Sequence, residues 1–262
     1  MMFFGEVTGK ATCLRSLSFL SIFVLLSINS AYSKDQLDNR IIKVVTQNDP
    51  GTAFVIGPAE NGRCLLVTAQ HVIDENSSSE PLIFLLPTGV KFTLLRQSFK
   101  SAMPDLDFAF TPVSSCNNSI GLPFARGSSI TVSTKVNIKG YPVDQESVHS
   151  VKVWPFIVTG RVTQYKELDP NSGNKYNGYD LSYDASTQPG YSGGPVLNDD
   201  GSELMAIHGF SDTVKDIQDV DMRERLRVGG RGISAPLIYK FLKESGYRMP
   251  RSDKMSCLVG VC

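Results

Sequence analysis

Three side chains suited to nucleophilic and acid–base chemistry stand directly beside short apolar segments. They are His71, Asp107 and Ser192. A serine hydroxyl becomes a nucleophile when a base takes its proton, and the base works best when an acid orients it. Taken singly, each residue has an ordinary structural interpretation. All three in this chain order, each in a suitable local setting, favour nucleophilic hydrolysis through a serine.

The turn around Ser192 is rich in glycine, with Gly190, Gly193 and Gly194 close by. Glycine permits backbone conformations that other residues rarely adopt, and it lets amide N–H groups approach a reacting atom. Such N–H groups stabilise the negative oxygen that develops when a serine attacks a carbonyl carbon. The turn therefore suits acyl transfer.

Short apolar runs separated by turn residues make up most of the remaining chain. Gly, Pro, Asn and Asp stand between the runs, as in residues 48–51 and 198–201. This pattern predicts a β-sandwich or barrel. One segment, Ala235–Glu244, has a helical period and is followed by Gly246 as a stop signal. We expect strands at Ile41–Val45, Ala53–Ile56, Cys64–Thr68, Leu82–Leu86, Phe108–Val113, Val136–Ile138, Val151–Val158, Val196–Leu197 and Leu204–Ile207.

The composition is that of an ordinary globular protein. The chain has 262 residues, of which 41% are hydrophobic and 20% charged, and 26 basic residues balance 26 acidic ones. This composition excludes a disordered chain. The charge balance gives no basis for nucleic-acid binding, because such proteins gather Lys and Arg on a basic surface.

The N-terminus follows the pattern of a signal peptide. Lys10 and Arg15 precede an uncharged apolar stretch, and Ala31 and Ser33 put small residues before a cleavage point after Ser33. An uncleaved membrane anchor is the alternative. A spanning helix needs about 20 mostly apolar residues, however, and this stretch is short and interrupted by serines. We expect residues 1–33 to be removed and the mature protein to be secreted or periplasmic, with no stable membrane insertion.

Cysteine usage agrees with export to an oxidising compartment. Cys13 lies in the expected signal peptide, which leaves Cys64, Cys116, Cys257 and Cys262. Four thiols allow three pairings. A bridge between the last two would close a small terminal loop and leave Cys64 with Cys116, but the sequence does not decide among the pairings. It holds no Cys-x-x-Cys pair, so we expect no metal site.

The segments around the three residues resemble the signatures of chymotrypsin-like (trypsin-fold) serine peptidases. Residues 68–72 are similar to the family's T-A-x-H motif, residues 107–110 to D-[ILF]-A-[LVF], and residues 190–195 to G-x-S-G-[GS]-P. The likeness spans residues 40–245. It implies an all-β fold of two six-stranded antiparallel β-barrels with a C-terminal helix. We place the first barrel at 34–130, the second at 131–234, and the helix with its Cys-containing tail at 235–262.

The resemblance also implies a role for each site residue. Ser192 would be the nucleophile, His71 the general base and then acid, and Asp107 the orienting acid. The amides of Gly190 and Ser192 would form the oxyanion hole. Asp105 is the alternative acid, but the family's pattern begins at Asp107.

Two other protein classes fit part of the pattern. Residues 190–194 also satisfy the G-x-S-x-G motif of α/β-hydrolases. That fold needs an acid and then a histidine after the serine, and His208 is the only histidine downstream. A secreted binding protein on a protease-like scaffold is the non-enzyme alternative, although such proteins usually lose a triad residue. We predict a secreted serine endopeptidase that is a monomer, acts on proteins or peptides, and uses no cofactor or metal.

Two further features concern the branch of the family and its specificity. In digestive trypsins an Asp before the serine pairs with a newly cut N-terminus, whereas Tyr191 stands there in this chain. The chain therefore looks like the bacterial branch.

Thr187 and His208 resemble the residues with which glutamyl endopeptidases bind an acidic side chain, since an imidazole and a hydroxyl can donate to a carboxylate. This suggests cleavage after Glu or Asp; alternatively, His208 only caps a hairpin strand. We expect the charged segment Lys215–Arg231 to be a solvated surface loop; alternatively, it shapes the pocket, with Arg223, Arg225 or Arg227 meeting an acidic substrate.

Overall fold

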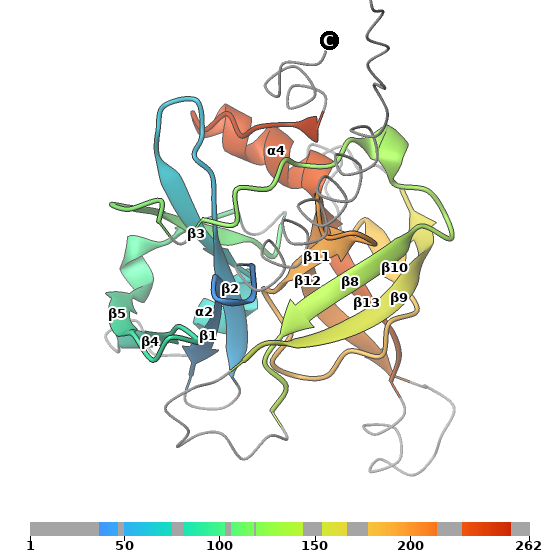
Figure 1. The fold of residues 1–262 in the computed structure, drawn as a ribbon, viewed down its shortest axis with the longest axis horizontal. Helices are drawn as coiled ribbons and strands as arrows, with labels where there is room; N and C mark the ends of the chain where they lie inside the picture. The colour runs from blue at the N-terminus through green and yellow to red at the C-terminus, as the bar shows by residue number, and fades with distance from the viewer. Residues whose placement is uncertain are drawn as a thin grey trace, which may run out of the picture. The chain divides into compact units, whose positions relative to one another are not determined.

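The computed structural model describes most of the chain from residue 37 onward. The expected signal peptide, Asp105, Cys257 and Cys262 lie outside the described residues. Those residues fold into two β-sheets and two short α-helices (Figure 1). The described ranges are 37–46, 50–74, 81–102, 106–117, 119–143, 154–166, 178–213 and 227–252.

The N-terminal sheet contains seven antiparallel strands in the order β5-β4-β1-β2-β3-β7-β6. The central strands β2 and β3 are buried along their whole length, as continuous apolar runs predict. Strand β3 pairs with β7 so that Thr68 lies opposite Ala109. This register brings the segment after β3 next to the segment before β7. The strands are β1 (Ile41–Val45), β2 (Gly51–Ile56), β3 (Cys64–Thr68), β4 (Pro81–Leu85), β5 (Lys91–Leu95), β6 (Lys100–Ser101) and β7 (Ala109–Val113), with helix α2 (Gln70–Asp74) after β3 and the 3₁₀ turn η1 (Arg96–Ser98) after β5.

The C-terminal sheet is a closed barrel of six antiparallel strands in the order β10-β13-β12-β11-β8-β9, and β9 pairs with β10 to close it. Strand β11 pairs with β12 only as far as Ile207, whereas β12 continues to Thr213 beside β13. A β-bulge interrupts β12 between His208 and Phe210. The strands are β8 (Lys135–Gly140), β9 (Phe156–Tyr165), β10 (Leu181–Tyr183), β11 (Pro195–Asn198), β12 (Leu204–Thr213) and β13 (Arg227–Ser234), with the 3₁₀ turn η2 (Gly127–Ser129) before β8 and helix α4 (Ala235–Glu244) after β13.

The expected all-β fold with a C-terminal helix is confirmed. Helix α4 has the predicted bounds. Its second residue is Pro236, which suits the first turn of a helix because that turn needs no N–H donor. The C-terminal sheet is the expected six-stranded barrel. The N-terminal sheet instead runs through seven strands, from β5 at one edge to β6 at the other.

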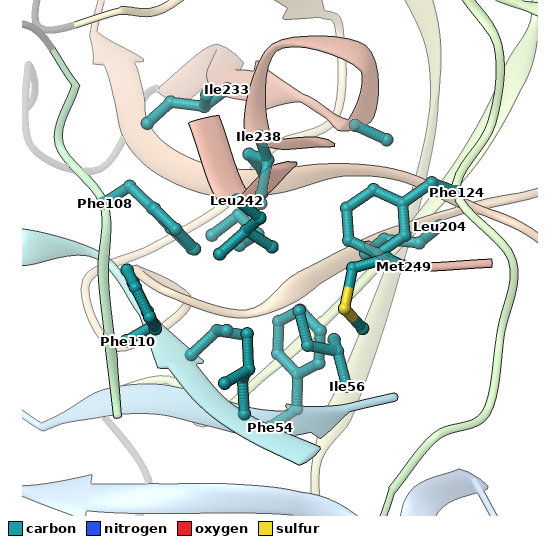
Figure 2. Close-up of a cluster of buried hydrophobic side chains, with 14 of the residues drawn as sticks. Phe54, Ile56, Phe108, Phe110, Phe124, Leu204, Ile233, Ile238, Leu242 and Met249 are labelled. Carbon is teal, nitrogen blue, oxygen red and sulfur yellow. The ribbon is translucent and has the colours of Figure 1, made fainter. Parts of the chain in front are cut away.

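One apolar core contains side chains from both sheets and from α4 (Figure 2). Phe54 of β2 and Phe110 of β7 come from the N-terminal sheet, Ile233 comes from β13, and Leu242 comes from α4. All four side chains are buried. Burial of an apolar side chain of this size contributes about 1.5–3 kcal/mol to folding, so this core stabilises the packing of the two sheets and the helix.

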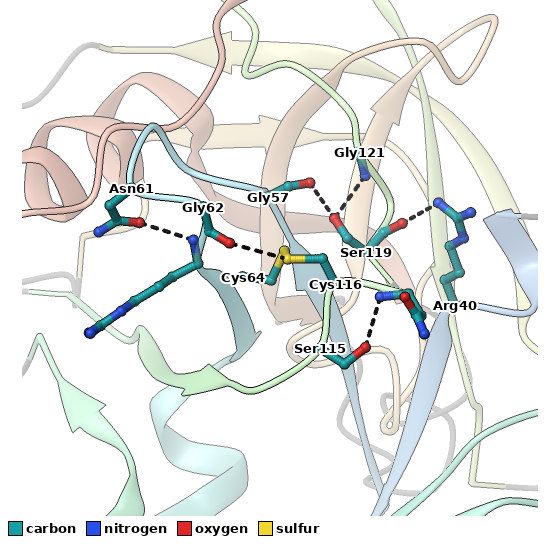
Figure 3. The surroundings of a disulfide bond; sticks show 11 residues. Arg40, Gly57, Asn61, Gly62, Cys64, Ser115, Cys116, Ser119 and Gly121 are labelled. Carbon is teal, nitrogen blue, oxygen red and sulfur yellow. Dashed lines mark hydrogen bonds between the residues drawn. A yellow bond between two sulfur atoms is a disulfide. The ribbon is translucent and has the colours of Figure 1, made fainter.

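A disulfide joins Cys64, the first residue of β3, to Cys116, just after β7 (Figure 3). Their Cα atoms are 5.4 Å apart, within the usual range for such bonds. The bridge connects the two paired strands at one end, and His71 and Asp107 lie beyond the opposite end. Of the pairings that the sequence leaves open, the structure contains Cys64–Cys116.

Strand prediction from the sequence is wrong at several places, each for a physical reason. Of the strand expected at Val151–Val158, residues 151–153 lie outside the described residues, and the described strand β9 begins at Phe156. The residue before it is Pro155, which has no N–H to donate to a β-ladder. Most of the expected loop Lys215–Arg231, residues 215–226, lies outside the described residues, and the prediction is wrong at its end, because residues 227–231 belong to β13. There Gly229 packs closely on β10, and a Cβ at this position would lie 2.6 Å from the Tyr183 carbonyl oxygen.

Among the described helices, none has both the length and the apolar character needed to cross a membrane.

Candidate active site

The pairing of β3 with β7 brings His71 and Asp107 together. His71 is the second residue of α2, directly after β3, and Asp107 lies just before β7. Asp107 Oδ2 accepts a hydrogen bond from His71 Nδ1 at 2.6 Å, and Oδ1 accepts one from the His71 backbone N–H at 2.8 Å. The Asp107 side chain is 4% exposed and the His71 side chain 42%. The carboxylate therefore holds the imidazole in the tautomer that carries its proton on Nδ1, which makes Nε2 the basic nitrogen.

The turn that carries Ser192 is fastened to the N-terminal sheet through Thr52 of β2. The Thr52 N–H donates to the Ser192 carbonyl at 2.8 Å, and the Thr52 hydroxyl donates to the Gly190 carbonyl at 2.6 Å. Thr68, at the end of β3, donates in turn to the Thr52 carbonyl at 2.8 Å. Ser192 thus lies in a turn bonded to β2, whose neighbour β3 leads directly to His71.

Gly193 lies where the Ser192 turn comes close to the segment between β3 and His71. Its φ of +84° favours glycine, and a Cβ there would lie 2.8 Å from the backbone nitrogen of Ala69, two residues before His71. A real Cβ does not approach a backbone atom so closely, so this contact requires glycine. The Ser192 hydroxyl donates to the carbonyl of Gly209 at 3.2 Å. The structure therefore brings the Ser192 turn against the segment that carries His71.

The backbone around Gly190 is arranged to present N–H groups. The carbonyl of Pro189 accepts a hydrogen bond from Val143 at 3.1 Å, and the carbonyl of Gly190 accepts one from Thr52. Within the part of the chain that the structure describes, the N–H groups of Gly190 and Ser192 donate to no acceptor. The φ of Gly190 is +98°. This arrangement can bind an oxyanion through two amides.

His208 lies on β12 of the barrel, close to Thr187. The imidazole is fully buried, and its Nδ1 is hydrogen-bonded to the Tyr183 hydroxyl. Its Nε2 is buried without a hydrogen-bond partner among the described residues. Burial, and then the charge of His71, lower the pKa of His208 to about 3. His208 is therefore neutral at neutral pH, with one nitrogen available to a ligand.

Gly230 of β13 packs directly against this imidazole, and a Cβ there would also lie 2.7 Å from Tyr183 Cε2. A Cβ at position 230 would lie 3.0 Å from His208 Cε1 and 3.0 Å from the Thr187 hydroxyl oxygen. That hydroxyl is 2.8 Å from the hydroxyl of Ser211. Thr187 and Ser211 thus add two hydroxyl groups to the buried imidazole, a set that can donate hydrogen bonds to an acidic side chain.

Two residues of the site are not found by sequence reasoning. Ser211 is missed because residues 208 and 210 of a regular strand share a face, whereas the bulge in β12 changes this alternation. Tyr179 is missed because nothing in its local sequence indicates a distant contact. Its hydroxyl donates to Asp107 Oδ2 at 2.5 Å.

The sequence also singles out Asp105, Tyr191 and the possibility of a metal site. Asp105, the alternative acid, lies outside the described residues. Tyr191 is buried against the barrel core, and burial raises its pKa to about 12. No group of three or more His, Cys, Asp or Glu side chains suited to a metal ion occurs within the described ranges.

The family model of the trypsin-like peptidase domain matches residues 51–207, which is more than half of the chain. This segment contains His71, Asp107 and Ser192. The chain therefore belongs to the trypsin-like peptidase domain family. No curated protein matches the sequence.

Two solved serine proteases have a similar fold. One is an HtrA-type protease, AlgW, solved with a tripeptide, with a TM-score of 0.59, 16% identity, and coverage of 82% of this chain and 62% of that one. The other is a serine endoprotease from Yersinia pestis, with a TM-score of 0.56, 17% identity, and coverage of 82% of this chain and 65% of that one. The chain thus spans less than two thirds of either protein. At such low identity, the likeness concerns the fold.

Proposed function

We propose that the protein is a serine endopeptidase in which Ser192 is the nucleophile, His71 the general base and acid, and Asp107 the residue that orients His71. The observation that carries the proposal is the 2.6 Å hydrogen bond from His71 Nδ1 to Asp107 Oδ2. Because this bond leaves the basic nitrogen of His71 at Nε2, the imidazole is prepared to take a proton from a hydroxyl. Membership in the trypsin-like peptidase family supports the same roles.

The reaction proceeds through an acyl-enzyme. Ser192 Oγ turns from the Gly209 carbonyl and attacks the scissile carbonyl carbon, while His71 Nε2 takes the hydroxyl proton. The N–H groups of Gly190 and Ser192 bind the resulting oxyanion. His71 then gives its proton to the departing amine as the peptide C–N bond breaks. Water then attacks the ester carbonyl carbon while His71 Nε2 takes one of its protons. His71 returns this proton to Ser192 Oγ as the ester C–O bond breaks, and the acyl group leaves as a carboxylic acid.

The substrate chain binds along β12. His208 is bonded through its backbone to Gly193 and Gly194. Beyond it, β12 is paired with β13 on one side and with no strand of the described residues on the other. A peptide can add to such an edge as a further strand through backbone hydrogen bonds. This edge begins beside Gly209, whose carbonyl accepts the bond from the Ser192 hydroxyl, so a peptide bound there has its scissile bond next to Ser192.

The pocket around His208 selects an acidic side chain before the scissile bond. A carboxylate beside His208 accepts hydrogen bonds from His208 Nε2 and from the Thr187 hydroxyl, which in turn accepts one from Ser211, while the Tyr183 hydroxyl donates to His208 Nδ1. This assignment gives a role to the buried Nε2 that has no partner among the described residues. Charge-assisted hydrogen bonds of this kind are about twice as strong as neutral ones.

The proposed function includes export of the protein from the cytosol. The Cys64–Cys116 disulfide supports it, because such bonds persist in oxidising compartments. The mature protein would act in the periplasm or outside the cell.

Labelling with a fluorophosphonate tests the hydrolase mechanism. We expect one equivalent of the probe to attach to Ser192 of the full mature chain, with a matching mass increase. Ser192→Ala is expected to abolish the labelling, whereas Ser129→Ala, a matched change at an exposed serine in η2, should leave it intact. If folded wild-type protein is not labelled, or if Ser192→Ala retains the label, the nucleophile assignment is wrong and a binding protein on this scaffold becomes the better explanation.

A series of peptides that differ only before the scissile bond tests the acidic preference. With Glu, Gln, Lys and Phe at that position, we expect kcat/KM to be highest for Glu, by about 100-fold or more over Gln. Thr187→Val removes one hydrogen-bond donor to the carboxylate and should reduce the Glu preference about tenfold or more, while Thr187→Ser should keep most of it. Equal cleavage of all four peptides would contradict the pocket assignment but leave the hydrolase mechanism standing.

A further inference from the structure

Asp107 has a hydrogen-bond donor from the other sheet. The Tyr179 hydroxyl donates to Asp107 Oδ2 at 2.5 Å. This is the oxygen that accepts the bond from His71 Nδ1. Tyr179 stands two residues before β10 of the barrel, whereas Asp107 stands two residues before β7 of the N-terminal sheet. The contact therefore connects the His71–Asp107 pair with the barrel that carries Ser192.

Gly209 makes room for this tyrosine. A Cβ at position 209 would lie 2.7 Å from Tyr179 Cζ and 2.8 Å from its hydroxyl oxygen, and it would overlap the ring edge at Cε1. Any larger residue at position 209 would push the ring away from Asp107. The sequence thus holds a tyrosine and a glycine, 30 positions apart, that fit each other at the site.

The tyrosine is a donor throughout the working pH range. Burial raises its pKa, and the negative charge of Asp107 and the hydrogen bond to that carboxylate raise it further. An ionised tyrosine beside this carboxylate would be strongly disfavoured. Asp107 consequently receives three hydrogen bonds: two from His71 and one from Tyr179.

We propose that Tyr179 is a positioning residue of the active site. Its O–H orients the Asp107 carboxylate toward His71. By donating to Oδ2, it also weakens the attraction between this oxygen and a protonated His71. The proposal rests on the proposed function for its effect on catalysis. Tyr179 acts only through Asp107, since its hydroxyl is bonded to that carboxylate and not to a reacting group. Without the O–H, the bond to His71 is the one that Oδ2 retains among the described residues, so the carboxylate is less constrained and interacts more strongly with a protonated imidazole.

Tyr179→Phe tests this proposal, because it keeps the ring over Gly209 and removes only the hydroxyl. We expect kcat to fall about ten- to a hundredfold, with KM changed less than about threefold. Tyr239→Phe on α4 is the same change at a partly buried tyrosine whose ring packs against Phe124 and Arg251, and it should behave as wild type.

A readout without turnover separates positioning from a merely structural role. The chain has only three histidines, so the titration of His71 can be followed by NMR and assigned with His71→Ala. We expect Tyr179→Phe to raise the midpoint of the His71 titration by about 0.5–1 pH unit, because the imidazolium then faces a less shielded carboxylate. Gly209→Ala should shift the midpoint in the same direction, since it displaces the ring.

An unchanged His71 midpoint together with wild-type kcat in Tyr179→Phe would overturn the positioning role. That result would not affect the proposed function, which is tested by labelling of Ser192 in the wild-type protein. Conversely, if wild-type protein is folded but not labelled, the proposed function fails, and the NMR shift still decides whether Tyr179 acts on the Asp107–His71 pair.

Discussion

Replacing Asp107 with asparagine is expected to lower kcat by about four orders of magnitude, the loss found when a triad aspartate becomes an amide. The local hydrogen bonds give the reason. The backbone N–H of His71 donates to Oδ1, so the amide oxygen of an asparagine would occupy that place. The amide NH2 would then face His71 Nδ1 and force the imidazole to carry its proton on Nε2, the nitrogen that must act as the base. The opposite amide orientation would set the NH2 against the His71 backbone N–H.

Steady-state kinetics on a peptide substrate, with circular dichroism to confirm folding, measures this effect. Asp199→Asn is the matched control. Asp199 is an exposed turn residue paired with Lys135 at 3.2 Å, and such a surface pair contributes little to stability. Activity of Asp107→Asn within tenfold of wild type would exclude Asp107 as the orienting acid. Asp105→Asn would then be the next variant to measure, because Asp105 is the alternative in the sequence.

Gly190→Ala is expected to lower kcat by about 10²–10³-fold, the usual loss when an oxyanion-hole donor is removed. Gly190 has a φ of +98°, and an added Cβ would overlap the carbonyl oxygen of Tyr141. Because that oxygen belongs to the backbone, the turn would have to move, and the Gly190 N–H would leave its place beside Ser192. We expect KM to change much less than kcat, because the lost interaction is made mainly in the transition state.

Gly201→Ala separates this effect from simple backbone strain. Gly201 also has a positive φ, +74°, but a Cβ there would meet nothing within 4 Å. It should cost some stability, seen as a small drop in Tm, with kcat unchanged. If Gly190→Ala is folded and has wild-type kcat, the Gly190 amide is not part of an oxyanion hole.

The sequence predicts those parts of the fold and site whose signals are local. Strand β3 and helix α4 are found with their observed bounds, because apolar runs and a helical period are read over a few residues. The sequence places the His71 motif at the end of one strand and the Asp107 motif at the start of another, and the family resemblance implies that they meet. The pairing of those strands, Thr68 opposite Ala109, is what the structure adds.

The parts that escape prediction depend on tertiary contacts. Residues 227–231 read as a charged loop, yet they form the start of β13, where glycines allow close packing against β10 and His208. Tyr179 gives no signal at all, because its contact with Asp107 exists only once the two sheets have met. The role of Ser211 depends on a bulge, and no regular alternation predicts one.

The hydroxyl of Thr52 has a consequence for the order of folding. Its bond to Gly190 joins positions that are 138 residues apart in the chain. Contacts of such long range form slowly, since closing a long loop costs entropy before any interaction is gained. In a partly folded chain, before β2 has bonded to the turn that contains Gly190 and Ser192, this turn therefore lacks its native conformation. If the proposed function holds, the chain becomes able to cleave peptides only after β2 has docked against the Ser192 turn.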